Sequence, residues 1–169
     1  MTSSSSSGLA RFNALAHDEV ADVLHEICSS DAWVAALLAS HPYATAADLL
    51  AEGDAATAAL SGEELAEAMA GHPPIGRPEP GDPVSAREQR GMADASDALR
   101  AEMLELNLAY QERFGHVFLI CATGATGEQM RDALRARAAN TPERENAIVR
   151  TELGKINRIR LTRLLTEGE

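Results

Sequence analysis

The only proline-rich stretch of the chain opens with a histidine, which suggests acid–base chemistry at that point. His72 follows Gly71, a typical helix end, and residues 72–83 hold five of the seven prolines. Because proline at that density excludes a helix or a central strand, we predict a stiff loop. A histidine held still there suits general acid–base catalysis, since its unperturbed pKa is about 6.5. The competing interpretation is an ordinary capping or surface histidine.

Three polar residues fall at helical spacing just before an apolar stripe. Ser85, Glu88 and Gln89 precede Met92, so helical spacing places them on the face expected to be buried. One interpretation is a capping box with a solvated helix end. The other is the polar floor of a pocket, where a carboxylate and an amide bind ligand N–H groups and backbone N–H groups hold an anion.

An arginine also falls on an apolar stripe, near the end of the chain. The stripe predicts the buried face of the last helix, and it consists of Val149, Leu153, Ile156 and Leu164. Arg160 lies on this face. A structural ion pair or a side chain that reaches out to solvent is one interpretation. An anion clamp is the other, since guanidinium groups match carboxylates.

Helices are the elements expected to position these groups. Hydrophobic residues make up 45% of the 169 residues but aromatic residues only 4%, which favours close-packed helices over a sheet. Helix starts and stops predict helices near residues 17–29, after caps at Asp31, Thr45 and Ser61, over Ser85–Arg113, from Thr126 to Asn140, and over 142–165. No linker divides them, so we predict one all-α helical-bundle domain over residues 9–169, after a disordered serine-rich tail at 1–8.

The charge and the cysteines limit the function classes. A formal net charge of −11 opposes binding to nucleic acid or to an anionic membrane, so an anionic substrate needs a local arginine or helix N-terminus. The start MTSSSSSG lacks a signal-peptide pattern, and no apolar run suits a membrane span. Two cysteines without a pairing pattern favour the cytoplasm. The histidines form no zinc motif, so no metal is expected.

Four ordered motifs carry a resemblance to a known family. They are HPPIG at 72–76, S-x-x-E-Q at 85–89, N-x-x-Y-x-x-R-F-G-H-V-F-L-I-C-A-T-G at 107–124, and E-L-x-K-I-N-R-I-R-L at 152–161. Together they resemble the 2-oxo-4-hydroxy-4-carboxy-5-ureidoimidazoline (OHCU) decarboxylases, especially the short actinobacterial type. The resemblance covers about residues 9–165, nearly the whole expected domain.

The resemblance implies a fold, a reaction and an assembly. The family is an all-helical bundle that uses no metal or organic cofactor. It is a lyase of purine metabolism that decarboxylates OHCU, a product of urate degradation, to (S)-allantoin. The expected partner is therefore a small-molecule substrate, with no nucleic acid and no membrane. Because dimers occur in the family, a homodimer is one expected assembly.

The resemblance also implies which residues form the site. His72 matches the catalytic histidine, and the substrate-contacting positions fall on Pro73, Ser85, Glu88, Gln89, Phe118, Leu119, Ile120, Cys121 and Ala122. One departure is Ala125, where many relatives carry an arginine implicated in substrate binding. Arg113 or Arg160 could replace it as the anion clamp. The departure keeps one alternative open, an inactive or repurposed family member that acts as a ligand-binding module. A second alternative is a non-catalytic helical adaptor, in which the polar groups act only as helix caps.

Overall fold

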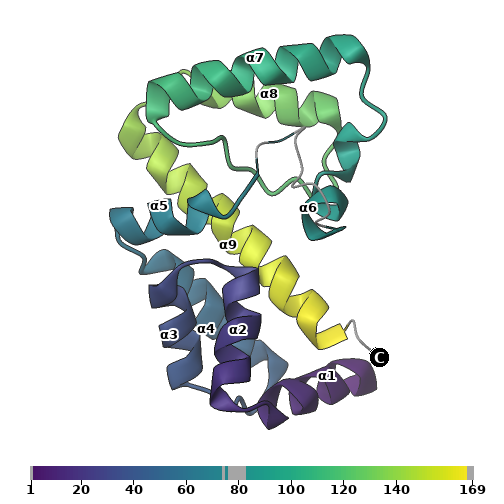
Figure 1. Ribbon diagram of the computed structural model, residues 1–169, viewed down its shortest axis with the longest axis vertical. Helices are drawn as coiled ribbons and strands as arrows, with labels where there is room; N and C mark the ends of the chain where they lie inside the picture. Colours follow the sequence, from purple (N-terminus) through teal and green to yellow (C-terminus); the bar gives the residue numbers. More distant parts are fainter. Residues whose placement is uncertain (1, 74, 76–82, 167–169) are drawn as a thin grey trace. The chain divides into compact units, whose positions relative to one another are not determined.

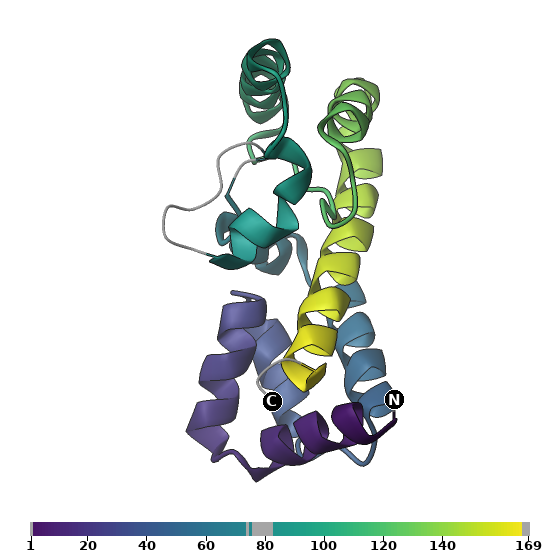
Figure 2. The ribbon, with the colours of Figure 1, turned by 90° about the vertical axis from the view of Figure 1, so that its right-hand side faces the viewer.

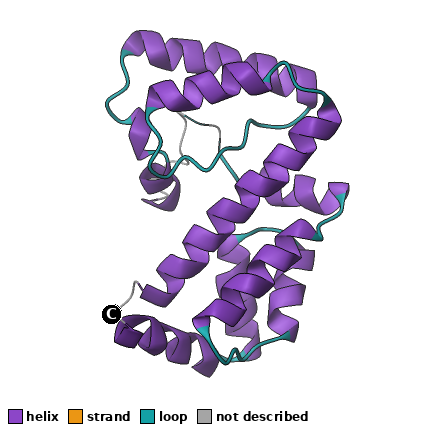
Figure 3. Cartoon of the chain, turned by 180° about the vertical axis from the view of Figure 1, so that it is seen from behind, coloured by secondary structure: helices purple, strands orange, loops and turns teal. Residues whose placement is uncertain are grey.

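The computed structural model describes residues 2–73, 75 and 83–166. Over these residues the chain forms nine α-helices and one short 3-10 helix, with no strand (Figures 1 and 3). The all-α expectation is confirmed. None of the helices described is both long and apolar enough to cross a lipid bilayer.

Contacts divide the chain into two compact units. Unit 1 contains Met1–Ala68 and Gly154–Glu169, and unit 2 contains Met69–Leu153. The last helix, α9 (Pro142–Thr166), continues without a break through the boundary at Leu153. A single domain over residues 9–169 stays a prediction.

Unit 1 is built from α1 (Thr2–Ala14), α2 (His17–Ile27), α3 (Asp31–Ala39), α4 (Ala46–Ala58), most of α5 (Gly62–Ala70) and the end of α9. Two of the expected helix caps in this unit are found where predicted, and the third lies one residue earlier in the sequence. Thr45 caps α4, and Ser61 forms a reciprocal capping box with Glu64. The cap of α3 is Ser30, whose hydroxyl accepts the Trp33 N–H, and not Asp31, which is the first helical residue.

The first helix covers most of the segment that was expected to be a disordered tail, and the disorder of that tail stays a prediction. The structure describes residues 2–8 as part of α1, continuous with the segment that carries buried Leu9 and Phe12. A Cβ atom on Gly8 would lie 1.7 Å from the carbonyl oxygen of Leu165, so the two backbones are in direct contact. Glycine permits so close a backbone contact, because it has no Cβ atom.

Unit 2 contains α6 (Pro83–Glu88), a 3-10 helix η1 (Arg90–Met92), α7 (Asp97–Phe114), α8 (Gly127–Arg137) and the first part of α9. Figures 1 and 2 show α7 and α8 side by side. The apolar spacing of Met92, Leu99, Met103, Leu106 and Tyr110 predicts an inward stripe. Four of these residues are buried in the shared core, and Leu106 packs against it partly buried. Thr126 forms a capping box with Gln129, and α9 begins at Pro142, as expected.

The prediction of one continuous helix over Ser85–Arg113 is wrong. The helix α6 ends at Glu88, and Ser96 caps a new helix, α7, by accepting the Leu99 N–H. Between them, the backbone at Gly91 contacts Ala125 so closely that a Cβ would lie 1.9 Å from the Ala125 carbonyl oxygen. The apolar spacing did not reveal the break, because Met92 before it and Leu99 after it are both buried.

Candidate active site

The loop that begins at His72 is anchored at three points, all within unit 2. The His72 N–H donates to the carbonyl of Met69, 3.0 Å away, at the end of α5. Asn107 of α7, which is buried, donates from Nδ2 to the carbonyl of Ile75 at 3.1 Å. Gln89 donates from Nε2 to the carbonyl of Pro73 at a longer 3.5 Å. His72 is half-buried, and these hydrogen bonds hold the described residues of its loop, His72, Pro73 and Ile75.

The Ser85–Gln89 segment was expected to open a long helix, but it lies in and just after a short one. Glu88 is the last residue of the short helix α6 and Gln89 follows it, so neither lies in the first turn of a long helix. Ser85 and Glu88 were expected to form a capping box there, together with a backbone anion site. The capping box with Ser85 as N-cap is wrong, because α6 begins earlier, at Pro83. The polar pocket floor stays a prediction. Glu88 and Gln89 are nevertheless buried, at 9% and 7% exposed, and the side chain of Ser85 lies outside the described part.

The Phe118–Ala122 segment connects α7 to α8 without regular secondary structure. Phe118, Leu119 and Ala122 are buried, while Ile120 and Cys121 are half-buried. Phe118 and Ala122 share one apolar cluster with Ile75 of the His72 loop and with Met92, which follows Gln89. The cluster thus contains two residues of this segment, together with Ile75, three residues after His72, and Met92, three residues after Gln89.

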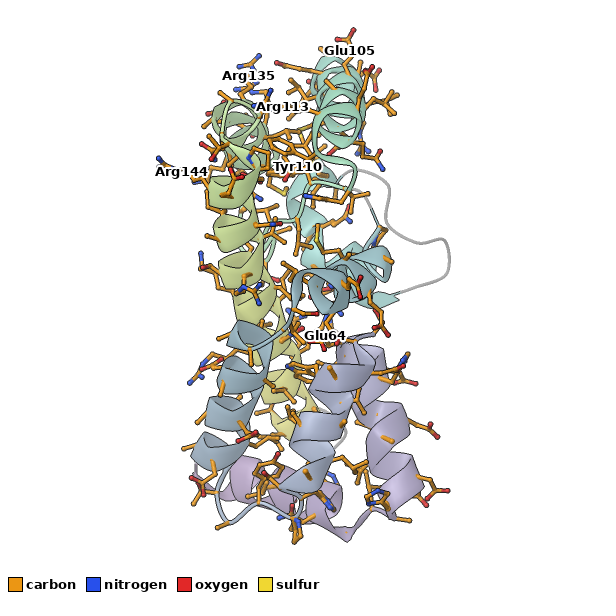
Figure 4. The ribbon with its side chains drawn as sticks, turned by 90° about the vertical axis from the view of Figure 1, so that its left-hand side faces the viewer. Glu64, Glu105, Tyr110, Arg113, Arg135 and Arg144 are labelled. Atoms are coloured by element: carbon orange, nitrogen blue, oxygen red, sulfur yellow. The ribbon has the colours of Figure 1, made fainter. Side chains whose placement is uncertain are left out.

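A buried ion pair lies beside this segment. Arg137 donates from Nε and Nη2 to one carboxylate oxygen of Glu145, at 2.8 and 2.5 Å. The Tyr110 hydroxyl donates to the same oxygen at 2.5 Å. Arg137 also donates from Nη1 to the carbonyl of Leu119 at 2.7 Å, and its guanidinium lies 4.4 Å from the centre of the Phe118 ring. Figure 4 shows Tyr110 on the side of α7 that faces α9.

The electrostatics of this cluster favour the ionised carboxylate. Burial would raise the pKa of Glu145, which is fully buried, but hydrogen bonds from Arg137, Tyr110 and Asn140 and the Arg137 charge lower it below its ordinary value. Burial, followed by the hydrogen bond to Glu145, raises the pKa of the Tyr110 hydroxyl. The cluster is therefore a charged pair with a neutral phenol.

A second buried carboxylate, that of Glu152, binds the segment directly, two residues after Leu119. The Cys121 N–H donates to Oε1 of the buried Glu152, 3.2 Å away. Glu145 and Glu152 stand seven residues apart on α9, with Val149 between them on the same buried stripe. Sequence reasoning missed both carboxylates and Arg137. The signal was available, because Glu145 and Glu152 interrupt an apolar face in the same way as Arg160.

The two arginines expected as an anion clamp lie in different units. Arg113, exposed at the end of α7, donates from Nη2 to the Asn140 carbonyl at 2.9 Å, and its guanidinium lies 5.1 Å from the centre of the Phe114 ring. Arg160 belongs to unit 1, where it donates from Nη1 to the Ile27 carbonyl at 2.7 Å. The anion-clamp role of either residue stays a prediction.

Ala125, the departure from the family pattern, is part of a tight turn in unit 2. It is half-buried against the apolar cluster, and its carbonyl lies against Gly91. Gly124 before it has a φ of 80°, a left-handed value that favours glycine, and Thr126 after it caps α8. Across the residues described, no group of three or more His, Cys, Asp or Glu side chains could hold a metal ion.

Sequence comparison identifies relatives over most of the chain. A family model described as OHCU decarboxylase matches residues 13–162. A uric acid degradation bifunctional protein of Arabidopsis thaliana is 32% identical over 108 residues, covering 60% of this chain and 33% of that protein. Another, from Bacillus subtilis, is 28% identical over 158 residues, covering 92% of this chain and 32% of that one.

A third curated relative carries the family activity in its name. The 2-oxo-4-hydroxy-4-carboxy-5-ureidoimidazoline decarboxylase of Amia calva is 40% identical over 70 residues, covering 41% of this chain and 39% of that protein. In all three comparisons the match therefore spans less than two fifths of the relative's length.

Solved structures share the fold. The crystal structure of an OHCU decarboxylase in the presence of (S)-allantoin superposes with a TM-score of 0.76 at 27% identity, covering 85% of this chain and 96% of that one. The crystal structure of an (S)-allantoin synthase, at 24% identity, has the same fold with a TM-score of 0.69, covering 90% of this chain and 52% of that one. Because the family model spans residues 13–162, the chain belongs to the OHCU decarboxylase family.

Proposed function

We propose that this chain is a cofactor-independent carboxy-lyase that converts OHCU to (S)-allantoin and carbon dioxide in urate breakdown. Family membership supports the reaction. The observation that carries the assignment to this site is the apolar cluster that contains Ile75, Met92 and Phe118, with the Gln89–Pro73 hydrogen bond beside it. These contacts bring together three segments that are far apart in the sequence but share the expected substrate contacts.

The substrate sets the tasks for such a site. OHCU carries a carboxylate and a hydroxyl on one ring carbon, next to a C=N bond. Breaking the carbon–carboxylate bond releases carbon dioxide, and the electron pair moves into the C=N system, whose nitrogen takes up a proton. The hydroxyl then loses its proton as the ring carbonyl forms, and the neighbouring carbon gains one. The site must orient the carboxylate and deliver that last proton to one face.

The roles follow from the chemistry of the side chains. His72 transfers the protons, because an imidazole can both accept and donate near neutral pH. Glu88 and Gln89 bind the ureido and ring N–H groups, assisted by Ser85 and Pro73. The backbone of Phe118–Ala122 lines the remaining edge of the substrate. Burial of Phe118 and Leu119 supports this role, since low polarity strengthens hydrogen bonds nearby.

A second candidate function is ligand binding without turnover, and Ala125 is the observation that favours it. If no other guanidinium takes over from the arginine of many relatives, the carboxylate is bound weakly and the bond to it is not activated. Arg113 and Arg160 are the candidate replacements. In this alternative the chain still binds allantoin, and binding raises its melting temperature by mass action.

A stereochemical assay separates these functions. The two upstream enzymes of urate breakdown generate OHCU in the cuvette, and circular dichroism then follows the formation of chiral allantoin. The lyase produces an (S)-allantoin signal whose rate is proportional to the concentration of this protein. Racemic allantoin at the background rate, combined with an allantoin-dependent rise in melting temperature, favours the binding module. Neither signal would favour the helical adaptor.

The proposal extends to assembly and location. A homodimer in the cytoplasm, without a nucleic-acid partner, fits the family and the net charge of −11. Light scattering coupled to size-exclusion chromatography measures the mass directly. A monomeric mass at all concentrations would remove the dimer from the proposal and leave the reaction untouched.

A further inference from the structure

The Phe118–Ala122 segment is irregular, yet two buried charged side chains fix its backbone. Arg137 of α8 binds the Leu119 carbonyl at 2.7 Å, and Glu152 of α9 binds the Cys121 N–H at 3.2 Å. Arg137 is 8% exposed and Glu152 is 9% exposed. An irregular segment has no ladder of its own to hold its backbone, so these side chains replace one.

The two contacts determine which edge of the segment stays available. Arg137 of α8 binds the Leu119 carbonyl and Glu152 of α9 accepts the Cys121 N–H, so both groups are directed at these helices. The N–H and carbonyl of Ile120 stand between the two, and neither Arg137 nor Glu152 binds them.

A buried ion pair is a costly way to fill a core. Taking both charges out of water opposes their attraction, and apolar residues of similar volume often stabilise as well or better. The Arg137–Glu145 pair does one thing that apolar residues cannot do. Glu145 orients the guanidinium through Nε and Nη2, which leaves Nη1 directed at the Leu119 carbonyl.

We propose that Arg137 and Glu152 are positioning residues, which set the Phe118–Ala122 backbone so that the Ile120 edge faces the substrate. This inference rests on the proposed lyase function. Arg137 and Glu152 touch the segment and act on the substrate only through it. Their loss displaces the binding edge, and displacement of about 1 Å can reduce turnover about 10²-fold.

The first test removes the Arg137 contact without stranding a charge. In the double variant Arg137→Met/Glu145→Gln both charges disappear together, and the amide oxygen still accepts the Tyr110 hydroxyl. We expect kcat/KM to fall about 10²-fold, mainly in kcat, with a lower enantiomeric excess of (S)-allantoin. Arg135→Met is the matched control, since Arg135 lies on the same helix but is exposed and pairs with Glu102. It should keep wild-type values.

The second test uses a conservative rescue at Glu152. Glu152→Leu removes the acceptor of the Cys121 N–H, whereas Glu152→Gln keeps an oxygen there. We expect turnover and enantiomeric excess to fall in the leucine variant and to recover in the glutamine variant. A merely structural role would move melting temperature in both but would leave the enantiomeric excess unchanged.

One outcome overturns the inference, and another separates it from the proposed function. Folded Arg137→Met/Glu145→Gln and Glu152→Leu proteins with wild-type kcat/KM and enantiomeric excess would show that neither residue positions the segment. If the wild-type protein itself has no turnover, the lyase proposal fails, and amide hydrogen exchange at Cys121 still decides the positioning. Faster exchange in Glu152→Leu than in Glu152→Gln supports it, and equal exchange contradicts it.

Discussion

At the scale of single residues, the buried carboxylate of Glu145 depends most strongly on its hydrogen-bond and ion-pair partners. Four donor groups bind it, two from Arg137 and one each from Tyr110 and Asn140, and its side chain is fully buried. A carboxylate in such a place is stable only while its partners remain, because an uncompensated buried charge loses hydration without replacement. Both its stability contribution and its pH response follow from this.

A double-mutant cycle measures the interdependence of the pair. Arg137→Met leaves Glu145 buried without its cation and should lower the free energy of unfolding by about 3–5 kcal/mol. The double variant Arg137→Met/Glu145→Gln should lose clearly less, because no charge remains unpaired. Urea denaturation of the four proteins gives the coupling energy. Additive losses would mean that the two side chains do not interact in solution.

The lowered pKa of Glu145 predicts a stability loss in acid. Its pKa lies below the ordinary 4.5 in the folded chain, so the unfolded chain binds the proton more readily. The stabilising contribution is therefore complete above about pH 4.5 and disappears as the pH falls through the folded pKa. The difference in unfolding free energy between wild type and Glu145→Gln should be constant near neutral pH and should shrink below pH 4.5. A difference that stays flat into acid would contradict the shift.

Sequence patterns selected some residues of the candidate site and missed others. His72, Glu88 and Gln89 stand out because a proline-rich loop and a polar break in an apolar stripe are visible locally. Arg137 does not stand out, since a surface-type helix end can carry such a charge. Glu145 does interrupt an apolar face, but a carboxylate near a helix start is also common for electrostatic reasons alone. Only the packing of α7, α8 and α9 places them beside Leu119.

At the scale of elements, the break between α6 and α7 decides where the site residues lie. The break puts Glu88 and Gln89 at the end of a short helix, and the Gly91 backbone packs against Ala125. The sequence predicted the helix boundaries that rest on strong caps, such as Thr45 and Thr126. It missed this one, because Met92 and Leu99 keep helical spacing across the break, although Gly91 and Ser96 were the available signals.

Two glycine substitutions test the break. Gly91→Ala places a Cβ within 1.9 Å of the Ala125 carbonyl oxygen, which is backbone and cannot move aside cheaply. We expect a loss of about 1–3 kcal/mol in unfolding free energy, as for an overpacked core. Gly62→Ala is the matched control, because nothing lies within 4 Å of its Cβ position in α5, and it should stabilise by about 0.4–1 kcal/mol. Chemical denaturation measures both, and a harmless Gly91→Ala would mean that the contact is looser than described.

At the scale of the whole molecule, composition predicted the fold class, and ordered motifs predicted the family. Abundant aliphatic residues with only 4% aromatics suit packed helices, and the family model then covers residues 13–162. The division into two compact units was not predicted, because α9 continues through the boundary and no linker marks it. The segments expected to bind substrate, other than the candidate clamp Arg160, all belong to unit 2.

Under the proposed function, the acidic chain has to bind an anionic substrate. Its net charge of −11 repels carboxylates at long range, so recognition has to come from short-range groups inside the site. Within the site, proton transfer by His72 is the central claim of the proposal, because it links the geometry of the loop to the stereochemistry of the product.

The most direct measurement compares wild type with His72→Asn, using in situ OHCU and circular dichroism of allantoin. We predict that wild type forms (S)-allantoin and that the variant turns over about 10²- to 10⁴-fold more slowly, with unchanged helical content. His17→Asn, at an exposed histidine at the start of α2, should behave as wild type. Full turnover with undiminished (S)-selectivity in His72→Asn would contradict the account.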